Sequence, residues 1–371
     1  MSDSKHLPAL DGLRGMAVLI VFILHYGGGA QSGNLLLRSV GFAIHAGWSG
    51  VTLFFILSGF LITGILWDSR NTAHWWRNFY IRRALRIFPL YYATLFVVFL
   101  SAVLAHNGLL ALTRLWMYAL FLQDIPALQT KLVDFGSSLW LGHFWSLAIE
   151  EQFYLVWPFL ITRMKTVRQA QHLCITVFVL SILFRAAIWL FNPSPVEYNQ
   201  FLFTRAGELA AGGYLAMCFR DTLWSRLQSR ARLITPLALA GFLAVCAVTR
   251  SFEVASGLMV NLGLPFITIF YSGFLVLSLG KGLVNRFARM AWLRWFGSIS
   301  YGLYVIHQLL HTSYEDLATF LAPHAGHNAQ CALIFLLAAT ISTSLAWLSL
   351  RFFETPFLKL RTRYKSSPAL V

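Results

Sequence analysis

Arg14 and His25, in the first apolar stretch of the sequence, combine a permanent cation with a base that titrates near neutral pH. Eleven helical steps of about 100° return to within about 20° of the starting direction and advance about 16 Å. The spacing therefore predicts one helix face that carries a phosphate-binding group at one end and a proton-transfer group at the other. A snorkelling arginine and a hydrogen-bonded core histidine would give the same spacing.

Few other ionisable residues lie within apolar stretches, where such groups are costly and usually mark a pathway or a site. They are Asp11, Glu150, Glu151, Arg185, Arg205, Glu208 and His307. Residues three apart are neighbours on a helix surface. We therefore expect Asp11 to orient Arg14, Arg205 to pair locally with Glu208, and Arg185 to pair with a buried acid.

The composition of the 371-residue chain places these groups in a membrane protein. The chain is 58% hydrophobic and 12% charged, whereas a soluble domain carries about 25% charged residues. This excludes a soluble enzyme, a disordered chain and a disulfide-rich secreted module. The four cysteines form no CxxC motif, and His307 and His311 have ligand spacing but no third ligand, so no metal site is expected.

Eleven apolar runs of roughly membrane-spanning length follow one another along the chain. They are residues 8–27, 41–67, 87–106, 111–125, 143–162, 172–191, 200–219, 233–250, 257–280, 294–312 and 328–350. No soluble domain of useful size fits between them. The predicted fold is an all-α, polytopic membrane helical bundle that forms a single domain over residues 1–371.

The basic residues, which give a formal net charge of +15, gather between alternate apolar runs. The clusters are Arg70, Arg77, Arg82, Arg83 and Arg86; Arg163, Lys165 and Arg168; Arg220, Arg226, Arg230 and Arg232; Lys281, Arg286, Arg289 and Arg294; and Arg351, Lys359, Arg361, Arg363 and Lys365 in a basic tail at about 351–371. The other loops hold Arg38, Arg114, Lys131 and Arg250. This asymmetry follows the positive-inside rule and argues against nucleic-acid binding.

Cytoplasmic clusters must be separated by an even number of spans, yet three runs lie between the first and second clusters. The run at 111–125 covers only about 22 Å, short of a core about 30 Å thick. We predict that it is re-entrant or interfacial, which leaves about ten spans with both termini in the cytoplasm. Alternatively, 143–162 fails to cross, since it contains Glu150 and Glu151.

Six segments resemble, in order, motifs of the acyltransferase-3 family of membrane O-acyltransferases. They are LDGLRGMAVLIVFILHY at 10–26, GVTLFFILSGFLI at 50–62, FYIRRALRIFPLY at 79–91, FWSLAIEEQFYLVWP at 144–158, SISYGLYVIH at 298–307 and RFFETPF at 351–357. The late SYxxYLxH-like segment has Leu303 and Tyr304 in transposed order. Because the chain has no room for the extra periplasmic hydrolase-like domain of some members, it resembles the stand-alone form.

The resemblance implies transfer of an acyl group, most often acetyl, from cytoplasmic acyl-CoA to a hydroxyl on the far side of the inner (plasma) membrane. The implied acceptor is a cell-surface or exported glycan, such as lipopolysaccharide or exopolysaccharide, or a lipid-linked sugar. The partners expected are therefore acyl-CoA, a glycan and membrane lipid, without nucleic acid or metal.

The resemblance also implies roles for individual residues. Arg14, Arg83 and Arg86 would hold the CoA phosphates, and His25 would act as base or take part in an acyl relay. Glu150 and Glu151 are candidates to orient His25. A further set either lines the acceptor route or forms an interface belt: Tyr301, Tyr304 and His307.

Two interpretations compete with these roles. Ser58 in LSGF could be a nucleophile, but we favour helix packing through small residues. A transporter or flippase of a sugar- or acyl-containing substrate would also use intramembrane Arg, Glu and His. The sequence shows no internal repeat of broken helices, which counts against the transporter.

Overall fold

The computed structural model describes residues 7–27, 44–129, 138–191, 199–254 and 256–364. Every regular element within them is a helix, so the all-α prediction is confirmed for this part of the chain. Arg38, Lys131 and Lys365, named above for their charge, lie outside the described residues.

Seven helical segments are long and apolar enough to cross a membrane, fewer than the ten spans predicted. They are α1 (Pro8–Tyr26), η1 (His45–Trp48) with α3 (Ser49–Ser69), α4 (Trp75–Leu104), α8 (Val167–Phe191), α11 (Leu223–Thr249), η3 (Met259–Gly263) with α12 (Leu264–Ser278), and the segment His327–Arg363 that begins with α16 (His327–Leu348). Three further helices of 17 residues occupy three of the four remaining predicted runs: α7 (Trp145–Ile161), α10 (Leu202–Cys218) and α14 (Ala291–His307). At 1.5 Å per residue, each of these three is about 26 Å long.

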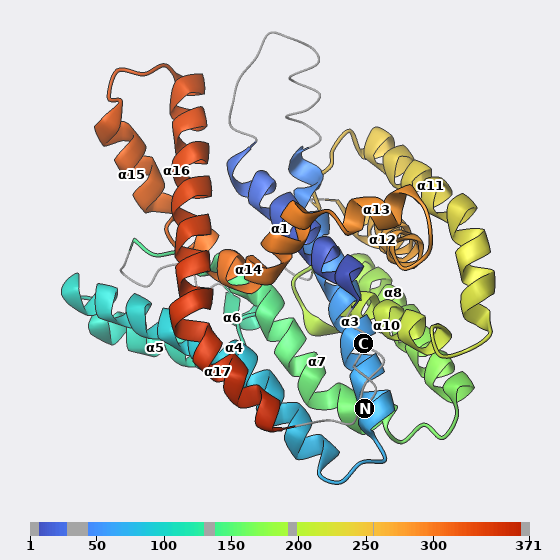
Figure 1. Cartoon of the computed structure of the whole chain (residues 1–371). Helices are drawn as coiled ribbons and strands as arrows, with labels where there is room; N and C mark the ends of the chain where they lie inside the picture. The colour runs from blue at the N-terminus through green and yellow to red at the C-terminus, as the bar shows by residue number, and fades with distance from the viewer. Residues whose placement is uncertain (1–6, 28–43, 130–137, 192–198, 255, 365–371) are drawn as a thin grey trace.

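The run at 111–125 forms the short helix α5 (Gly108–Ala119), which packs against α4 at the edge of the bundle (Figure 1). Its 12 residues reach about 18 Å, too little for a bilayer core about 30 Å thick. The one-turn helix α6 (Pro126–Gln129) follows it, and η2 (Gly142–Phe144) precedes α7. The length of α5 therefore favours it as the segment that does not cross.

The centre of the bundle is built on α1, which packs against α14 and α3, while α3 packs in turn against α10 (Figure 1). Glycines permit these close approaches. A Cβ atom on Gly15 would lie 1.9 Å from the carbonyl oxygen of Leu293, and one on Gly59 would lie 1.8 Å from that of Leu209. Any larger residue would push the helices apart. Gly59 is thus the packing residue of the LSGF segment.

The outer helices lie on two sides of this centre. In Figure 1, α16 lies on one side with α4 and α5, and α8, α11 and α12 lie on the other. Two short helices were not predicted, α13 (Leu283–Ala288) and α15 (His311–Leu321). The predicted span at 294–312 ends at His307, where the chain turns into α15 and packs against α16.

The predicted basic tail is helical as far as Arg363. After α16 the chain continues through η4 (Ser349–Glu354), α17 (Thr355–Leu360) and η5 (Arg361–Arg363), and α17 and η5 pack against α4. The first part of the tail is therefore held against the bundle, and this contact brings Arg361 to the arginines of α4.

Candidate active site

Three cavities adjoin one another between the arginine end and the histidine end of α1. The basic cavity, of about 310 Å³, and the middle cavity, of about 90 Å³, share Arg14, Arg83 and Arg86 as wall residues. The middle cavity and the outer cavity, of about 520 Å³, share Val51 and Tyr304. Arg14 lies on the first two walls and His25 on the third, as expected for groups on one face of a helix.

The basic cavity gathers guanidinium groups from three segments of the chain. Its wall contains Arg14 from α1, Arg82, Arg83 and Arg86 from α4, and Arg361 from η5. Asp11 is on the same wall, with Oδ1 3.8 Å from Nη1 of Arg14, which confirms the predicted pair. Five arginines beside one acid favour a multiply charged anion, because guanidinium groups bind phosphate oxygens through charge-assisted hydrogen bonds.

Two of these arginines were not predicted as site residues. From the sequence, Arg82 and Arg361 were assigned only to the basic clusters that determine the orientation in the membrane. Arg82 directly precedes Arg83 of the RxxR motif. It lies about one helical turn before Arg86, so both side chains can reach the same cavity. Arg361 is far from α4 in sequence and reaches the cavity only because the end of the last helical segment packs against α4.

The middle cavity contains a carboxyl group held by two hydroxyls. Ser58 Oγ donates to Glu150 Oε1 at 2.7 Å, and the Tyr154 hydroxyl donates to Glu150 Oε2 at 3.1 Å. Arg83 lies on the same wall, and its guanidinium is 5.7 Å from the Tyr154 ring centroid. Ser58 therefore orients a carboxyl group, a role that neither interpretation of the sequence predicted.

Glu151 has a different environment from its neighbour. Successive helical residues point about 100° apart, and Glu151 is not among the wall residues of the three cavities. Its buried Oε1 atom has no hydrogen-bond partner among the described residues. The structure also brings neither glutamate into hydrogen-bond contact with His25 among these residues, because the hydroxyls hold Glu150 in the middle cavity.

The three aromatic and imidazole candidates on α14 lie at different depths. The Tyr301 hydroxyl donates to the Ile87 carbonyl at 2.6 Å and is on the middle wall. The Tyr304 hydroxyl donates to the His143 carbonyl at 2.8 Å and lies where the middle and outer cavities meet. His307 is buried behind both and lines neither cavity.

His307 is instead the partner of His25. Its Nε2 atom is 3.1 Å from Nδ1 of His25, and its Nδ1 atom faces the carbonyl oxygens of Leu303 at 3.1 Å and Tyr304 at 2.7 Å. Carbonyl oxygens only accept, so Nδ1 of His307 carries a hydrogen, and when the ring is neutral its Nε2 is an acceptor. His25 therefore donates through Nδ1, which leaves the Nε2 lone pair of His25 available as a base.

A third histidine, missed in the sequence, completes this cluster. His143 begins the run at 143–162 and lies in η2, where its ring centroid is 5.1 Å from that of His307. Its Nε2 atom donates to the Val305 carbonyl at 3.2 Å, and its side chain lines the outer cavity beside His25. Only the packing of η2 against α14 places it there, so no local signal could have identified it.

The other buried charges lie away from the cavities. Glu208 Oε1 is 3.4 Å from Nη1 of Arg205 and 3.6 Å from Nη1 of Arg185, so both predicted pairs are confirmed. Within the described residues, no group of three or more His, Cys, Asp or Glu side chains is arranged to hold a metal ion.

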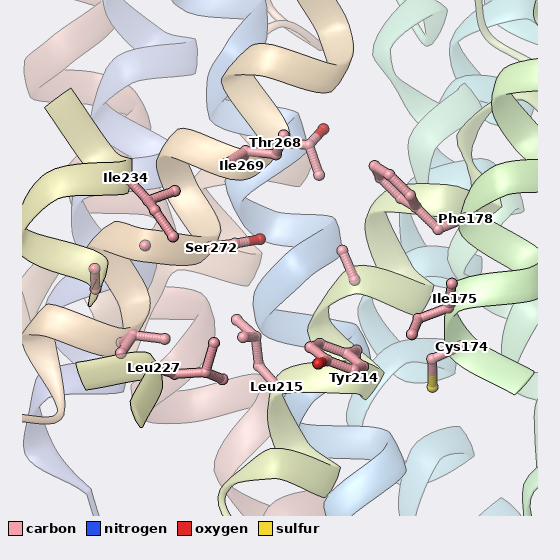
Figure 2. A pocket seen from close by; sticks show the side chains of 14 residues that line it. Cys174, Ile175, Phe178, Tyr214, Leu215, Leu227, Ile234, Thr268, Ile269 and Ser272 are labelled. Carbon is pink, nitrogen blue, oxygen red and sulfur yellow. The ribbon is translucent and has the colours of Figure 1, made fainter. Parts of the chain in front are cut away.

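A further cavity, of about 230 Å³, is separate from this route. It lies between α8, α10, α11 and α12 and is lined mainly by apolar side chains, with Cys174, Tyr214 and Ser272 among the few polar ones (Figure 2). It shares no wall residue with the other three cavities. Since its described wall holds no arginine, histidine or carboxylate, we assign it no part in the chemistry.

Comparison with known proteins supports an acyltransferase. The acyltransferase-3 family model, described as an acyltransferase domain, matches residues 7–351. The chain is 31% identical over 379 residues to the peptidoglycan O-acetyltransferase OatA of Listeria monocytogenes, covering 96% of this chain and 56% of that protein. It is 25% identical over 382 residues to the O-acetyltransferase OatA of Staphylococcus aureus, covering 97% and 58%. The chain thus spans a little over half the length of these relatives, and no solved structure matches it significantly.

Proposed function

Because the chain belongs to the acyltransferase-3 family, we propose that it is a membrane O-acetyltransferase that transfers an acetyl group from cytoplasmic acetyl-CoA to a hydroxyl of an exported cell-surface glycan. The names of the relatives, which are O-acetyltransferases and in one case act on peptidoglycan, support this reaction and this class of acceptor. The observation that carries the proposal is the series of three cavities that leads from five arginines to His25.

The charge of the basic cavity supports an anionic donor such as acetyl-CoA. The phosphates of CoA would bind the arginines of the basic cavity. The middle cavity, of about 90 Å³, is too small for a nucleotide, and the pantetheine arm, which is thinner than the nucleotide, would lie along it. The arm would pass Tyr301 and Tyr304 and bring the thioester carbonyl toward His25.

His25 would then act as the general base. Its Nε2 atom takes the proton of the acceptor hydroxyl while the hydroxyl oxygen attacks the thioester carbonyl. The carbon–sulfur bond breaks, and the CoA thiolate takes the proton back from Nε2. His307 keeps His25 in the required tautomer throughout. A relay in which an acyl group first passes to His25 uses the same groups in two steps.

This mechanism needs the arginine end of α1 in the cytoplasm and the histidine end toward the exterior. The basic clusters at alternate loops support that orientation through the positive-inside rule. We therefore propose ten spans in the plasma membrane, with α5 not crossing and both termini cytoplasmic.

The test is acetyl transfer across a sealed membrane. Protein reconstituted into proteoliposomes receives radiolabelled acetyl-CoA on the arginine side and a glycan acceptor on the histidine side. The enzyme forms a labelled ester that is released by mild base, whereas a transporter or flippase forms none.

His25→Ala is expected to abolish ester formation, since the base is lost. His324→Ala, which changes an exposed histidine outside the cavities, is the matched control and retains activity. Full transfer by His25→Ala would contradict the proposed base.

A further inference from the structure

We propose that the outer cavity is the acceptor-binding site and that it recognises a pyranose ring that carries no charge. This inference rests on the proposed function, because it takes His25 as the base that meets the acceptor hydroxyl. It goes further by assigning the residues that hold the sugar and by selecting one class of sugar.

Tryptophan rings form a large part of the wall of this cavity. Trp48 comes from η1, Trp140 and Trp145 lie on either side of η2, and the three rings meet here. The Trp48 indole donates to the Phe252 carbonyl at 2.6 Å, and Trp145 packs edge-on against Phe55 with ring centroids 6.1 Å apart. These two rings are held in place, while Trp140 remains 40% exposed. Flat, rigid rings of this kind match the C–H faces of a pyranose and cost little entropy on binding.

Unpaired polar atoms on the same wall indicate that the ligand carries hydrogen-bond donors. Asn199 Oδ1 and Gln308 Oε1 are buried and have no hydrogen-bond partner among the described residues. A buried acceptor without a partner is destabilising, and its presence in a native structure calls for an explanation. Both side chains line the outer cavity, and a rotation of either amide would present its oxygen to a sugar hydroxyl, so the polar groups and the aromatic rings indicate the same ligand.

The charges on the wall select against an anionic sugar. The described wall residues include no lysine or arginine and one acid, Glu253, whose Oε1 is 3.1 Å from Nδ1 of His45. Among the described wall residues, an anionic sugar would meet Glu253 and no lysine or arginine to offset the repulsion. The basic cavity differs from the outer cavity in this respect, since its wall holds five arginines, which suit an anionic donor.

The site also places the ligand against the catalytic base. His25 and His143 lie on the same wall as the tryptophans, and Nε2 of His25 is the nitrogen left free by the bond to His307. A sugar stacked on Trp140 and held by the two amides would therefore present a hydroxyl to His25.

Binding is measured separately from turnover, so that the two proposals can fail independently. Protein in lipid nanodiscs is mixed with methyl β-D-glucuronide or with its primary amide, and saturation-transfer NMR records contact with each. The two probes share the pyranose ring and its hydroxyls and differ at C6, where one carries a carboxylate and the other an uncharged amide. We expect contact with the amide and at least about tenfold weaker binding of the anion.

The Trp140→Ala variant should weaken binding of the amide about tenfold, and Trp140→Phe should restore most of it. Trp116→Ala, at an exposed tryptophan of α5 outside the cavities, is the matched control and should leave binding unchanged. Equal binding of anion and amide, or unchanged binding by Trp140→Ala, would overturn the inference. Failure of acetyl transfer in proteoliposomes would overturn the proposed function without affecting this result.

Discussion

The Nε2 atom of His307 lies 3.1 Å from the Nδ1 atom of His25, although the two residues are separated by 282 positions in sequence. Two backbone carbonyls accept from Nδ1 of His307, and the Tyr26 hydroxyl donates to the backbone carbonyl of His307 at 2.5 Å. The ring therefore cannot turn without losing its contacts with the two carbonyls and with His25. His307 acts through His25 and is a positioning residue.

Replacing His307 should lower kcat more than it changes the KM for acetyl-CoA or the KM for the glycan acceptor. In His307→Phe, His25 loses its fixed tautomer, and we expect kcat for acetyl transfer to fall about 100-fold. His307→Gln can still accept from His25 through its amide oxygen, so it should recover part of the loss. Steady-state kinetics in proteoliposomes measures both variants. Equal losses in the two variants, with KM raised in parallel, would indicate a merely structural role.

Arg361 should contribute to donor binding together with Arg83. One charge-assisted hydrogen bond is worth about 1.5–3 kcal/mol, so Arg83→Ala or Arg361→Ala should raise the KM for acetyl-CoA at least about tenfold. The KM of the native protein should also rise with ionic strength, because salt screens the arginines. Arg363→Ala, two residues further along and exposed, should leave the KM unchanged. An unchanged KM in Arg361→Ala would exclude that residue from the donor site.

Helical periodicity was enough to predict the features that lie within one helix. The shared face of Arg14 and His25 and the Asp11–Arg14 and Arg205–Glu208 pairs all depend on steps of about 100°. Hydropathy likewise predicted the class of fold. These predictions needed no knowledge of how the helices pack.

Contacts between different helices could not be predicted from helical periodicity or hydropathy. The His25–His307 bond depends on the close approach of α1 and α14, and Arg361 depends on the packing of η5 against α4. His143 had no neighbour in sequence to mark it. Glu150 was a candidate to orient His25 that the sequence could not place, and two hydroxyls from α3 and α7 hold it in the middle cavity.

The approach of α3 to α10 should make Gly59 intolerant of even one methyl group. Its Cβ would lie 1.8 Å from the Leu209 carbonyl oxygen, so the helices must separate. We expect Gly59→Ala to lower the free energy of unfolding by about 1–3 kcal/mol. Gly326→Ala, where nothing lies within 4 Å of the new Cβ, is the matched control. Thermal unfolding in detergent measures both, and equal midpoints would show that the helices can move apart freely.

The buried cluster of Arg185, Arg205 and Glu208 holds two guanidinium groups against one carboxylate. Glu208→Gln would leave both cations without a counter-charge, and breaking a buried pair in this way costs about 3–5 kcal/mol. Arg185→Met would remove one cation and leave a balanced Arg205–Glu208 pair, so it should cost less although it loses the bond from Arg185 to the Thr204 carbonyl at 2.6 Å. Unfolding midpoints and the yield of monodisperse protein in detergent should therefore rank the native protein first, Arg185→Met second and Glu208→Gln last. If Arg185→Met were the less stable variant, the excess positive charge would be stabilised by a group other than Glu208.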